Sequence, residues 1–285
     1  MTNKLKSNIK KNKLLYLRTI SQILFFIFLP SVFTSAFNGV KYLFTQMNLK
    51  MSVELTSFLV VLITLCVFTI VFGRFFCGFA CAFGALGDWL NRFYVFVCKK
   101  LKKKPIKISK KITKLLLYLK YIVLLLIVLA CYFGLYASLK GYNPWEVFSV
   151  IRSGSFRLSG YALGIAIFIV LLFFMTIHER FFCKFICPMG AVFSLLPILP
   201  LFSLHRNREN CIKGCRACEM KCPADVVLPD KNESKICGDC IMCQKCISTC
   251  PKKNISTKSG LKGNEVWFTI LRCVILAILL VIIGV

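Results

Sequence analysis

Acidic residues are scarce in this sequence of 285 residues. Asp and Glu number 11 against 38 Lys and Arg, which gives a formal net charge of +27, yet only 17% of the residues are charged. Soluble domains average about 25% charged and about 45–50% apolar residues, whereas 58% of this chain is hydrophobic. This composition excludes a disordered polycation and is too apolar for a water-soluble fold. It also argues against nucleic-acid binding, because the lysines cluster beside apolar runs and not along a soluble face.

Long apolar runs recur along the chain. A helix needs about 20 mostly apolar residues to cross a bilayer, and five segments meet that requirement. Four of them contain no charged residue, and the fifth contains only Arg272, near enough to its start to reach the headgroups. They are residues 19–40, 55–73, 121–139, 158–177 and 266–285. We therefore expect an all-α polytopic protein of the cytoplasmic membrane, with about five transmembrane helices.

The lysines predict the sidedness of these spans, because short cytoplasmic loops carry an excess of Lys and Arg. Five lysines lie within residues 1–13 and nine within residues 99–114, whereas residues 41–54 contain two. We expect the N-terminus and residues 178–262 in the cytoplasm, and residues 140–157 and the C-terminus outside. A cleaved signal peptide is the alternative at the N-terminus, but the apolar run is longer than the about 7–15 residues of such peptides.

Two further stretches, 86–97 and 143–151, combine aromatic and charged residues as interfacial helices do. Ionisable residues near predicted span ends are Asp88, His178 and Glu179. We interpret them as charges at helix ends, and proton transfer with a quinone is the alternative.

Residues 73–85 and 179–191 are two copies of one motif, aligned without a gap at an offset of 106 residues. Each copy ends a pair of predicted spans, so we expect parallel hairpin repeats related by a pseudo-twofold axis along the membrane normal. Each copy has two cysteines four residues apart, which predicts that each pair shares a helix face. These candidate ligands for iron or a further iron–sulfur centre, with packing as the alternative, are Cys77, Cys81, Cys183 and Cys187. Cysteines 66, 98, 131 and 273 lack such a pattern and are interpreted as packing residues.

A cysteine-rich segment follows the second copy. One run has the C-x2-C-x2-C-x3-C-P spacing of bacterial ferredoxins, in which three cysteines bind one [4Fe–4S] cluster and the fourth binds its neighbour. An upstream run differs by one extra residue. We predict two [4Fe–4S] clusters with crossed ligands, one held by Cys211, Cys215, Cys218 and Cys250, the other by Cys240, Cys243, Cys246 and Cys222. Cys237 is left over, either as an alternate ligand in place of Cys211 or as an unliganded thiol.

Zinc and disulfides are the alternatives for these cysteines. Zinc sites favour separated pairs, and disulfides are disfavoured in the reducing cytoplasm where the topology puts this segment. Residues 205–262 contain 12 basic and 6 acidic residues. Two clusters with their thiolates add about −4, so the loaded segment stays mildly positive. That charge favours an acidic soluble partner such as a ferredoxin or flavodoxin, although a solvated surface or anionic lipid explains it equally well.

These features divide the chain into five predicted parts. Residues 1–98 and 115–204 form the two hairpin repeats, and residues 99–114 form a basic cytoplasmic linker between them. Residues 205–262 form an inserted small α+β two-cluster ferredoxin-like domain, and residues 263–285 form the last transmembrane helix.

The paired hairpins ending in R-x-x-C-x3-C, followed by the two cluster runs, resemble the NapH-type membrane ferredoxins. That family includes quinol dehydrogenase membrane subunits and the membrane core of the nitrous-oxide reductase regulator. The resemblance covers about residues 19–262 and implies electron transfer through [4Fe–4S] clusters to or from quinones or extracytoplasmic redox partners. Departures are Ala82 in place of the usual Pro, a fifth span, and the lack of a C-x-x-C-H haem site and of a motif for covalent flavin.

The sequence thus favours an electron carrier that positions its cofactors and makes no bonds itself. Electrons would pass between a soluble donor or acceptor, the clusters, and quinone or a partner redox subunit, in a direction that the sequence leaves open. The alternative is a membrane-anchored redox sensor or assembly factor that uses the same clusters. A thiol–disulfide relay is disfavoured, because C-x3-C is not the C-x-x-C of thioredoxins.

Overall fold

The computed structural model describes residues 13–106, 109–136, 141–152, 160–199, 202–230, 233, 237–257 and 265–284. Most of the first basic run, and parts of the predicted spans near residues 137–139 and 158–159, lie outside the described residues. So do residues 258–264, where the predicted ferredoxin-like domain ends. The chain forms two compact units, which are residues 1–29, 64–85 and 193–282, and residues 30–63, 86–192 and 283–285.

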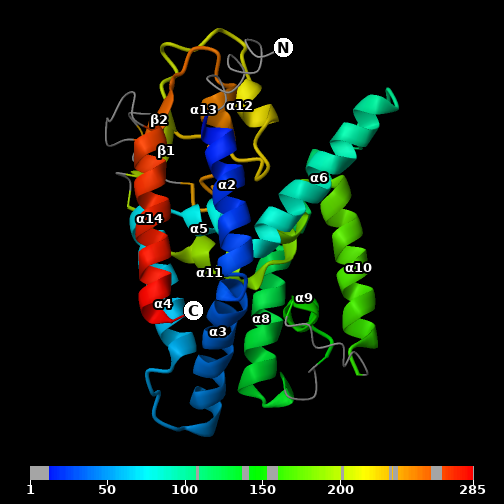
Figure 1. The fold of residues 1–285 in the computed structure, drawn as a ribbon, viewed down its shortest axis with the longest axis vertical. Coiled ribbons are helices and arrows are strands. Elements are labelled where there is room, and N and C mark those ends of the chain that lie inside the picture. The colour runs from blue at the N-terminus through cyan, green and yellow to red at the C-terminus, as the bar shows by residue number, and fades with distance from the viewer. Residues whose placement is uncertain are drawn as a thin grey trace. The chain divides into compact units, whose positions relative to one another are not determined.

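The first unit contains two long apolar helices and the cysteine-rich segment (Figure 1). Helix α2 contacts both the short helix α5 and helix α13. The two-stranded antiparallel sheet pairs β1 with β2, joining Leu204 to Thr257 and Arg206 to Ile255, and so closes the two ends of the cysteine-rich segment. The elements are α2 (Lys13–Phe28), α5 (Phe75–Phe79), β1 (Leu204–Arg206), α12 (Ala217–Met220), α13 (Lys245–Thr249), β2 (Ile255–Thr257) and α14 (Glu265–Ile283).

In the second unit, α3 contacts α8 and α9, α9 contacts α10, and α8 contacts the π-helix η2. Its elements are α3 (Val32–Leu49), α7 (Lys110–Leu116), α8 (Leu119–Tyr132), α9 (Pro144–Arg152), α10 (Ala162–Ile177) and η2 (Phe182–Ile186). Helices with residues in both units are α4 (Ser57–Phe72), α6 (Ala82–Lys100) and α11 (Pro188–Leu195), and the last residue of α14, Ile283, also belongs to the second unit.

Two helical segments of the described chain, 111–132 and 265–283, are long and apolar enough to cross a membrane. A third span results if α2 and α3 are taken together, although they meet at an angle of 65°. Helices α4 and α10 are apolar but shorter, with 16 residues each. The structure therefore gives two or three spans by length, against the five that the sequence predicts.

The predicted first span, residues 19–40, is not one continuous helix. Helix α2 ends at Phe28 and α3 begins at Val32, with Pro30 in the break. Proline lacks an N–H donor and disfavours helical backbone in the residue before it, which explains the break.

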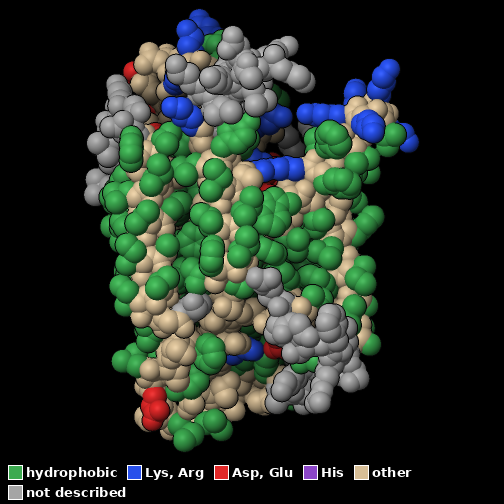
Figure 2. All heavy atoms as spheres, viewed as in Figure 1, with side chains coloured by type: hydrophobic (Ala, Val, Ile, Leu, Met, Phe, Trp, Pro, Cys, Tyr) green, Lys and Arg blue, Asp and Glu red, His purple; other side chains and the backbone are tan. Residues whose placement is uncertain are grey.

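Apolar side chains cover the exposed faces of α2 and α14 (Figure 2). On α14 they include Trp267, Leu271 and Ile278, each more than half exposed. Helices of this kind need an apolar surrounding, which a lipid bilayer supplies.

Both predicted amphipathic stretches are helical, as α6 and α9. Phe93 and Phe96 on α6 are exposed, as expected for an interfacial helix. Trp145 on α9 is instead buried, with its ring edge-to-face on Phe37 at 4.9 Å between centroids. It packs inside the unit and does not anchor the helix at the membrane surface.

Candidate iron–sulfur site

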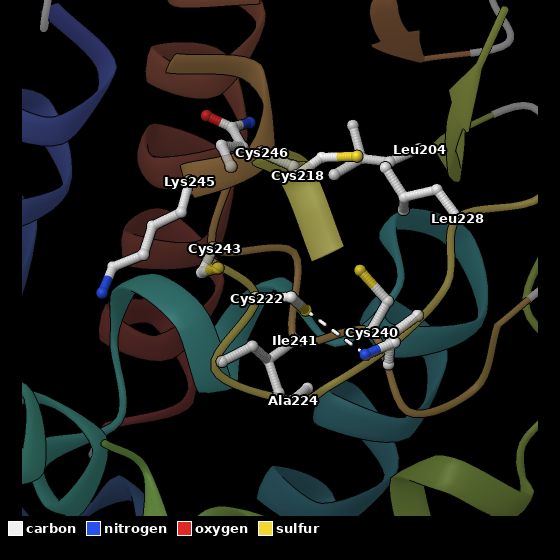
Figure 3. Close-up of a pocket in the computed structure, with 12 residues that line it drawn as sticks. Leu204, Cys218, Cys222, Ala224, Leu228, Cys240, Ile241, Cys243, Lys245 and Cys246 are labelled. Carbon is white, nitrogen blue, oxygen red and sulfur yellow. Dashed lines mark hydrogen bonds between the residues drawn. The ribbon is translucent and has the colours of Figure 1, made fainter. Parts of the chain in front are cut away.

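One pocket in the cysteine-rich segment is lined by the four cysteines that the sequence assigns to a single cluster (Figure 3). The sulfur atoms of Cys222, Cys240 and Cys243 point toward the enclosed space, and Cys246 and Cys218 also line it. The other lining side chains are mostly apolar, among them Leu204, Ala224, Val226, Leu228 and Ile241.

Local backbone geometry brings these cysteines together. Met242 and Gln244 both adopt left-handed backbone, with φ of 51° and 58°, so the chain turns sharply on either side of Cys243. Cys246 lies in α13, which follows this turn, and α13 packs against α12, which contains Cys218. The two cysteine runs are therefore adjacent. Crossed ligation requires this, because each run supplies one ligand to the cluster of the other.

The lining of the pocket is of the kind that holds an iron–sulfur cluster, because cysteine sulfur donors stand among apolar side chains. Within the described residues, no group of three or more His, Cys, Asp or Glu is arranged to hold one metal ion. A [4Fe–4S] cube needs four thiolates spaced around its corners, and an apolar, partly dry lining is the surrounding in which such clusters are held.

In the cysteine-rich segment, both cysteines that precede a proline accept the same backbone hydrogen bond. The Val226 N–H donates to Cys222 Sγ, and the Asn254 N–H donates to Cys250 Sγ, each over 3.4 Å. Hydrogen bonds to ligand sulfurs stabilise the thiolate and help to set cluster potentials. The two runs thus share a local geometry at their fourth cysteine, which the C-P pairs alone do not reveal.

Burial raises the pKa of three of the thiols in the pocket. Burial and then the neighbouring Cys243 raise the pKa of Cys222 to about 11. Burial also raises the pKa of Cys240 and of Cys246 above the ordinary thiol value. Cluster binding must therefore release protons from this site.

The first cysteine run lies beside a cation. Arg206 donates from Nη1 to Cys218 Sγ over 3.4 Å. This hydrogen bond, opposed by partial burial and helped by the nearby Cys211, raises the pKa of Arg206. Cys218 and Cys211 therefore share one charged neighbour.

The leftover Cys237 is half-buried and does not line the pocket. Burial raises the pKa of its thiol, whereas a hydrogen bond from the Asp239 backbone and the charge of Arg74 oppose the shift. Cys237 thus lies near Arg74, at the edge of the cluster loop.

The membrane cysteines do not share helix faces as the sequence predicts. Cys77 lies in α5, which ends at Phe79, and Cys81 lies in the break before α6. Cys183 lies in η2, and Cys187 follows it in extended backbone. Pro188 explains the second break, because the residue before proline avoids helical backbone. The break in the first copy occurs although Ala82 stands at the equivalent position.

All four membrane cysteines are buried. Cys187 Sγ accepts a hydrogen bond from the Gly190 N–H over 3.2 Å, and Cys183 Sγ accepts one from Arg180 Nη1 over 4.0 Å. Cys77 and Cys81 belong to the first unit, and Cys183 and Cys187 to the second. Their convergence on one metal or cluster stays a prediction.

Comparison with known proteins identifies the family. Residues 55–105 and 162–202 match a family described as a 4Fe-4S binding domain, and each matched segment contains one C-x3-C copy. A protein of Methanocaldococcus jannaschii, described as uncharacterised, is 35% identical over 259 residues, covering 88% of this chain and 98% of its own length. The ferredoxin-type protein NapH of Haemophilus influenzae is 29% identical over 65% of this chain and 62% of its own. The regulatory protein NosR of Stutzerimonas stutzeri is 28% identical over 62% of this chain and 24% of its own.

The chain belongs to the NapH-type membrane ferredoxin family. The resemblance seen in the sequence is thereby confirmed, and with it the assignment to a membrane. No solved structure is significantly similar to this NapH-type ferredoxin.

In this NapH-type ferredoxin the first membrane motif packs directly on the cluster loop. A Cβ added at Gly78 would lie 2.5 Å from the Ile241 carbonyl oxygen and 3.3 Å from the Cys243 nitrogen. The Gly78 carbonyl accepts hydrogen bonds of 3.2 Å from both Arg18 and Gln22 of α2. The sequence held one signal of this contact, since glycine stands at position 78 where the second copy has Lys184.

Asp88 and Arg180 form a buried pair in the second unit. Arg180 Nε lies 2.9 Å from Asp88 Oδ1, and Nη2 lies 2.6 Å from Oδ2. Both side chains are at most 1% exposed. Asp88 is therefore a buried counter-ion and not the solvated helix-end charge that the sequence indicated. His178 makes a local contact from Nδ1 to the Glu179 carbonyl oxygen at 3.0 Å.

Proposed function

We propose that this protein carries electrons through two [4Fe–4S] clusters between a soluble cytoplasmic partner and an acceptor or donor in the membrane. The observation that carries the proposal is the sulfur-lined pocket, whose loop lies in backbone contact with the first membrane motif at Gly78. A bound [4Fe–4S] cluster takes up and releases one electron at a time without making or breaking bonds in the protein.

In this proposal Cys240, Cys243 and Cys246 hold the second cluster together with Cys222. Cys211, Cys215 and Cys218 hold the first cluster with Cys250. The apolar side chains around the pocket limit access of water, and the N–H groups of Val226 and Asn254 stabilise one thiolate of each set. Crossed ligation keeps the two clusters close together, which suits stepwise transfer of electrons between them.

The contact at Gly78 gives the electron a route toward the membrane. Gly78 lies next to Cys77 in the chain and touches the backbone between Cys240 and Cys243. The route would continue at the membrane cysteines, either through a further iron–sulfur centre or directly to quinone or a partner redox subunit. One relative is named a ferredoxin-type protein, and this chain itself matches a 4Fe-4S binding domain. Both findings support the electron-transfer role.

Sidedness follows from the lysine-rich segments. With the N-terminus and the cysteine-rich segment on the cytoplasmic side, the net positive charge of residues 205–262 favours an acidic ferredoxin or flavodoxin as soluble partner. The C-terminus would then lie outside.

A membrane-anchored redox sensor or assembly factor is the second candidate. It is favoured by the similarity to NosR, which is named a regulatory protein, although the match covers a quarter of that protein. A sensor needs the same clusters but no sustained turnover.

Iron and sulfide analysis of the anaerobically purified full-length protein, combined with EPR, tests the proposal. We expect about eight irons from the two ferredoxin-type clusters. The C240S variant should lose the signal of one cluster, whereas C237S, three positions before the first pocket-lining residue of this loop, should keep both. A preparation that contains only zinc, or a C240S variant with unchanged iron, would overturn the cluster assignment.

A second measurement separates the two candidates. Dithionite-reduced protein is mixed with a soluble menaquinone analogue or with an oxidised ferredoxin, and cluster reoxidation is followed optically. Rapid reoxidation supports the electron carrier, and clusters that stay reduced with both acceptors favour the sensor.

A further inference from the structure

Arg74 and Arg180 occupy equivalent positions in the two copies of the motif, 106 residues apart. Arg180 binds Asp88 through two parallel hydrogen bonds. Arg74 donates from Nη1 to Ser194 Oγ over 3.0 Å. Because Ser194 lies 106 residues after Asp88, each arginine contacts the same position in the other copy. The two contacts differ only in the acceptor, a carboxylate in one and a hydroxyl in the other.

The hydroxyl changes what the arginine does. A carboxylate accepts two parallel hydrogen bonds from a guanidinium and balances its charge, as Asp88 does for Arg180. Ser194 accepts one hydrogen bond and carries no charge. Its own hydroxyl donates to Asp239 Oδ1 over 3.0 Å, and Arg74 Nη1 lies 3.6 Å from the same oxygen. Asp239 therefore supplies the counter-charge for an arginine that is only 2% exposed.

Asp239 directly precedes Cys240, so this contact acts on the cluster loop. The neighbouring Gly238 is also pressed against the same residue, because a Cβ added there would lie 2.7 Å from the Ser194 carbonyl oxygen. The loop is thus held at its start by Arg74 and Ser194, and at its middle by the backbone contact with Gly78.

We propose that Arg74 is a positioning residue that fastens the loop of residues 237–243, with the cluster it binds, to the first membrane motif through Asp239, and that serine at position 194 makes this possible. An aspartate at position 194 would give Arg74 a partner like that of Arg180 and would compete with Asp239 for its charge. The inference rests on the proposed function only for the cluster, since the contact itself involves protein groups alone.

The test compares S194D and D239N in the full-length protein, purified anaerobically. Hydrogen exchange measured by mass spectrometry reports on the docking of residues 237–243 whether or not iron is bound. We expect faster exchange of this peptide in both variants and unchanged exchange in the peptide around Cys218. S194A is the matched control, because it keeps the direct ion pair between Arg74 and Asp239, and we expect a smaller increase.

EPR-monitored redox titration supplies the second measurement. S194D adds a negative charge near the loop and D239N removes one, so the potential of the second cluster should fall in the former and rise in the latter. A residue that only supports the fold would not give shifts of opposite sign. R74K keeps the charge but not the planar fork. The potential of its second cluster should therefore stay close to the wild-type value.

The outcomes are distinguishable. Unchanged exchange in both S194D and D239N would overturn the inference. Shifted exchange in a protein that contains no iron would support the contact and overturn the proposed function. D239N keeps the test decisive if S194D does not fold, because the Asp239 side chain is 38% exposed and tolerates an amide of the same size.

Discussion

Gln244 Nε2 donates a hydrogen bond to Thr269 Oγ1 over 2.8 Å, and this contact ties the cluster loop to helix α14. Both side chains are buried. Gln244 follows Cys243 in the left-handed turn, and Thr269 lies one turn before Arg272 on the buried face of a helix long enough to cross the membrane. The turn that shapes the cluster site is therefore tied to a helix that is long and apolar enough to cross a membrane.

Replacing Thr269 by valine should destabilise the protein. The substitution keeps the shape of the side chain and leaves the buried Gln244 amide without this partner, which costs about 1–3 kcal/mol. Thermal unfolding of the detergent-solubilised protein measures the loss, and the EPR line shape of the second cluster should change as well. T34V is the control, since Thr34 bonds only to the Ser31 carbonyl at an exposed position. Equal effects of the two variants would contradict the prediction.

Replacing Gly78 by alanine should separate the first membrane motif from the cluster loop. The added methyl group meets the backbone carbonyl of Ile241 at 2.5 Å, so one of the two backbones must move. We expect a stability loss of about 1–3 kcal/mol and slower reoxidation of the clusters by a membrane acceptor. G87A is a matched control on α6, because its methyl group would meet only the flexible end of Met175 at 2.9 Å. If G87A and G78A behave alike, the close approach has no special role.

Replacing Asp88 by asparagine should be strongly destabilising, because it leaves the buried Arg180 without a charged partner. Breaking such a pair costs about 3–5 kcal/mol. The double variant D88N/R180M removes the unpaired charge and should recover part of the loss. Thermal unfolding of the three variants gives the coupling energy. An additive double variant would show that the two side chains do not act as a pair.

Arg272 should affect the clusters more than the fold. Four phenylalanine rings surround its guanidinium, the nearest being Phe268 with its centroid 4.1 Å from Cζ. Within the described residues none of its side-chain nitrogens has a hydrogen-bond acceptor. Replacing a buried charge by a similar apolar side chain is often neutral or stabilising, so R272M should keep or raise the unfolding temperature.

The same variant removes a positive charge close to Phe75 in the first membrane motif. Cluster potentials should therefore become more negative in R272M, because a nearby cation stabilises the reduced state. R272K, which keeps the charge, should stay near the wild-type value in EPR-monitored titration. Identical potentials in all three proteins would show that Arg272 serves packing alone.

Cysteine spacing pointed to the region of the candidate site, because cluster ligation needs thiolates at fixed intervals, and the ligand assignment itself stays a prediction. The spacing grouped Cys222 with Cys240, Cys243 and Cys246, and these four line one pocket. Nothing in the spacing indicated the N–H donors of Val226 and Asn254, since they depend on the path of the chain after each Cys-Pro pair.

Continuity of the helices was predicted less well. The i, i+4 pattern assumes unbroken helix through Cys81 and Cys187, but both cysteines lie at breaks. The apolar composition of residues 19–40 likewise gave no indication of the bend at Pro30. Hydropathy reports whether a residue suits lipid, and it is insensitive to the backbone hydrogen bonds on which helix continuity depends.

Long-range polar contacts had the weakest sequence signal. Asp239 and Arg74 are separated by much of the chain, and only the alignment of the two copies marks Ser194 as the exception to Asp88. Such a substitution becomes informative once the structure reveals that the two arginines reach across to equivalent positions.

Arg74 and Arg180 each contact a residue of the other copy of the motif, and these contacts also bear on how the chain arose. Two identical hairpins associating by twofold symmetry would make the same arginine–aspartate contact twice, because symmetry repeats every interaction. In a symmetric dimer both equivalent positions carry the same residue. In one fused polypeptide each position can change independently of the other. Position 88 kept its carboxylate, whereas position 194 carries a serine and its arginine contacts the cysteine-rich segment. Position 194 is thus both the place where the arginine contacts of the two copies differ and the place where the cysteine-rich segment meets the first copy.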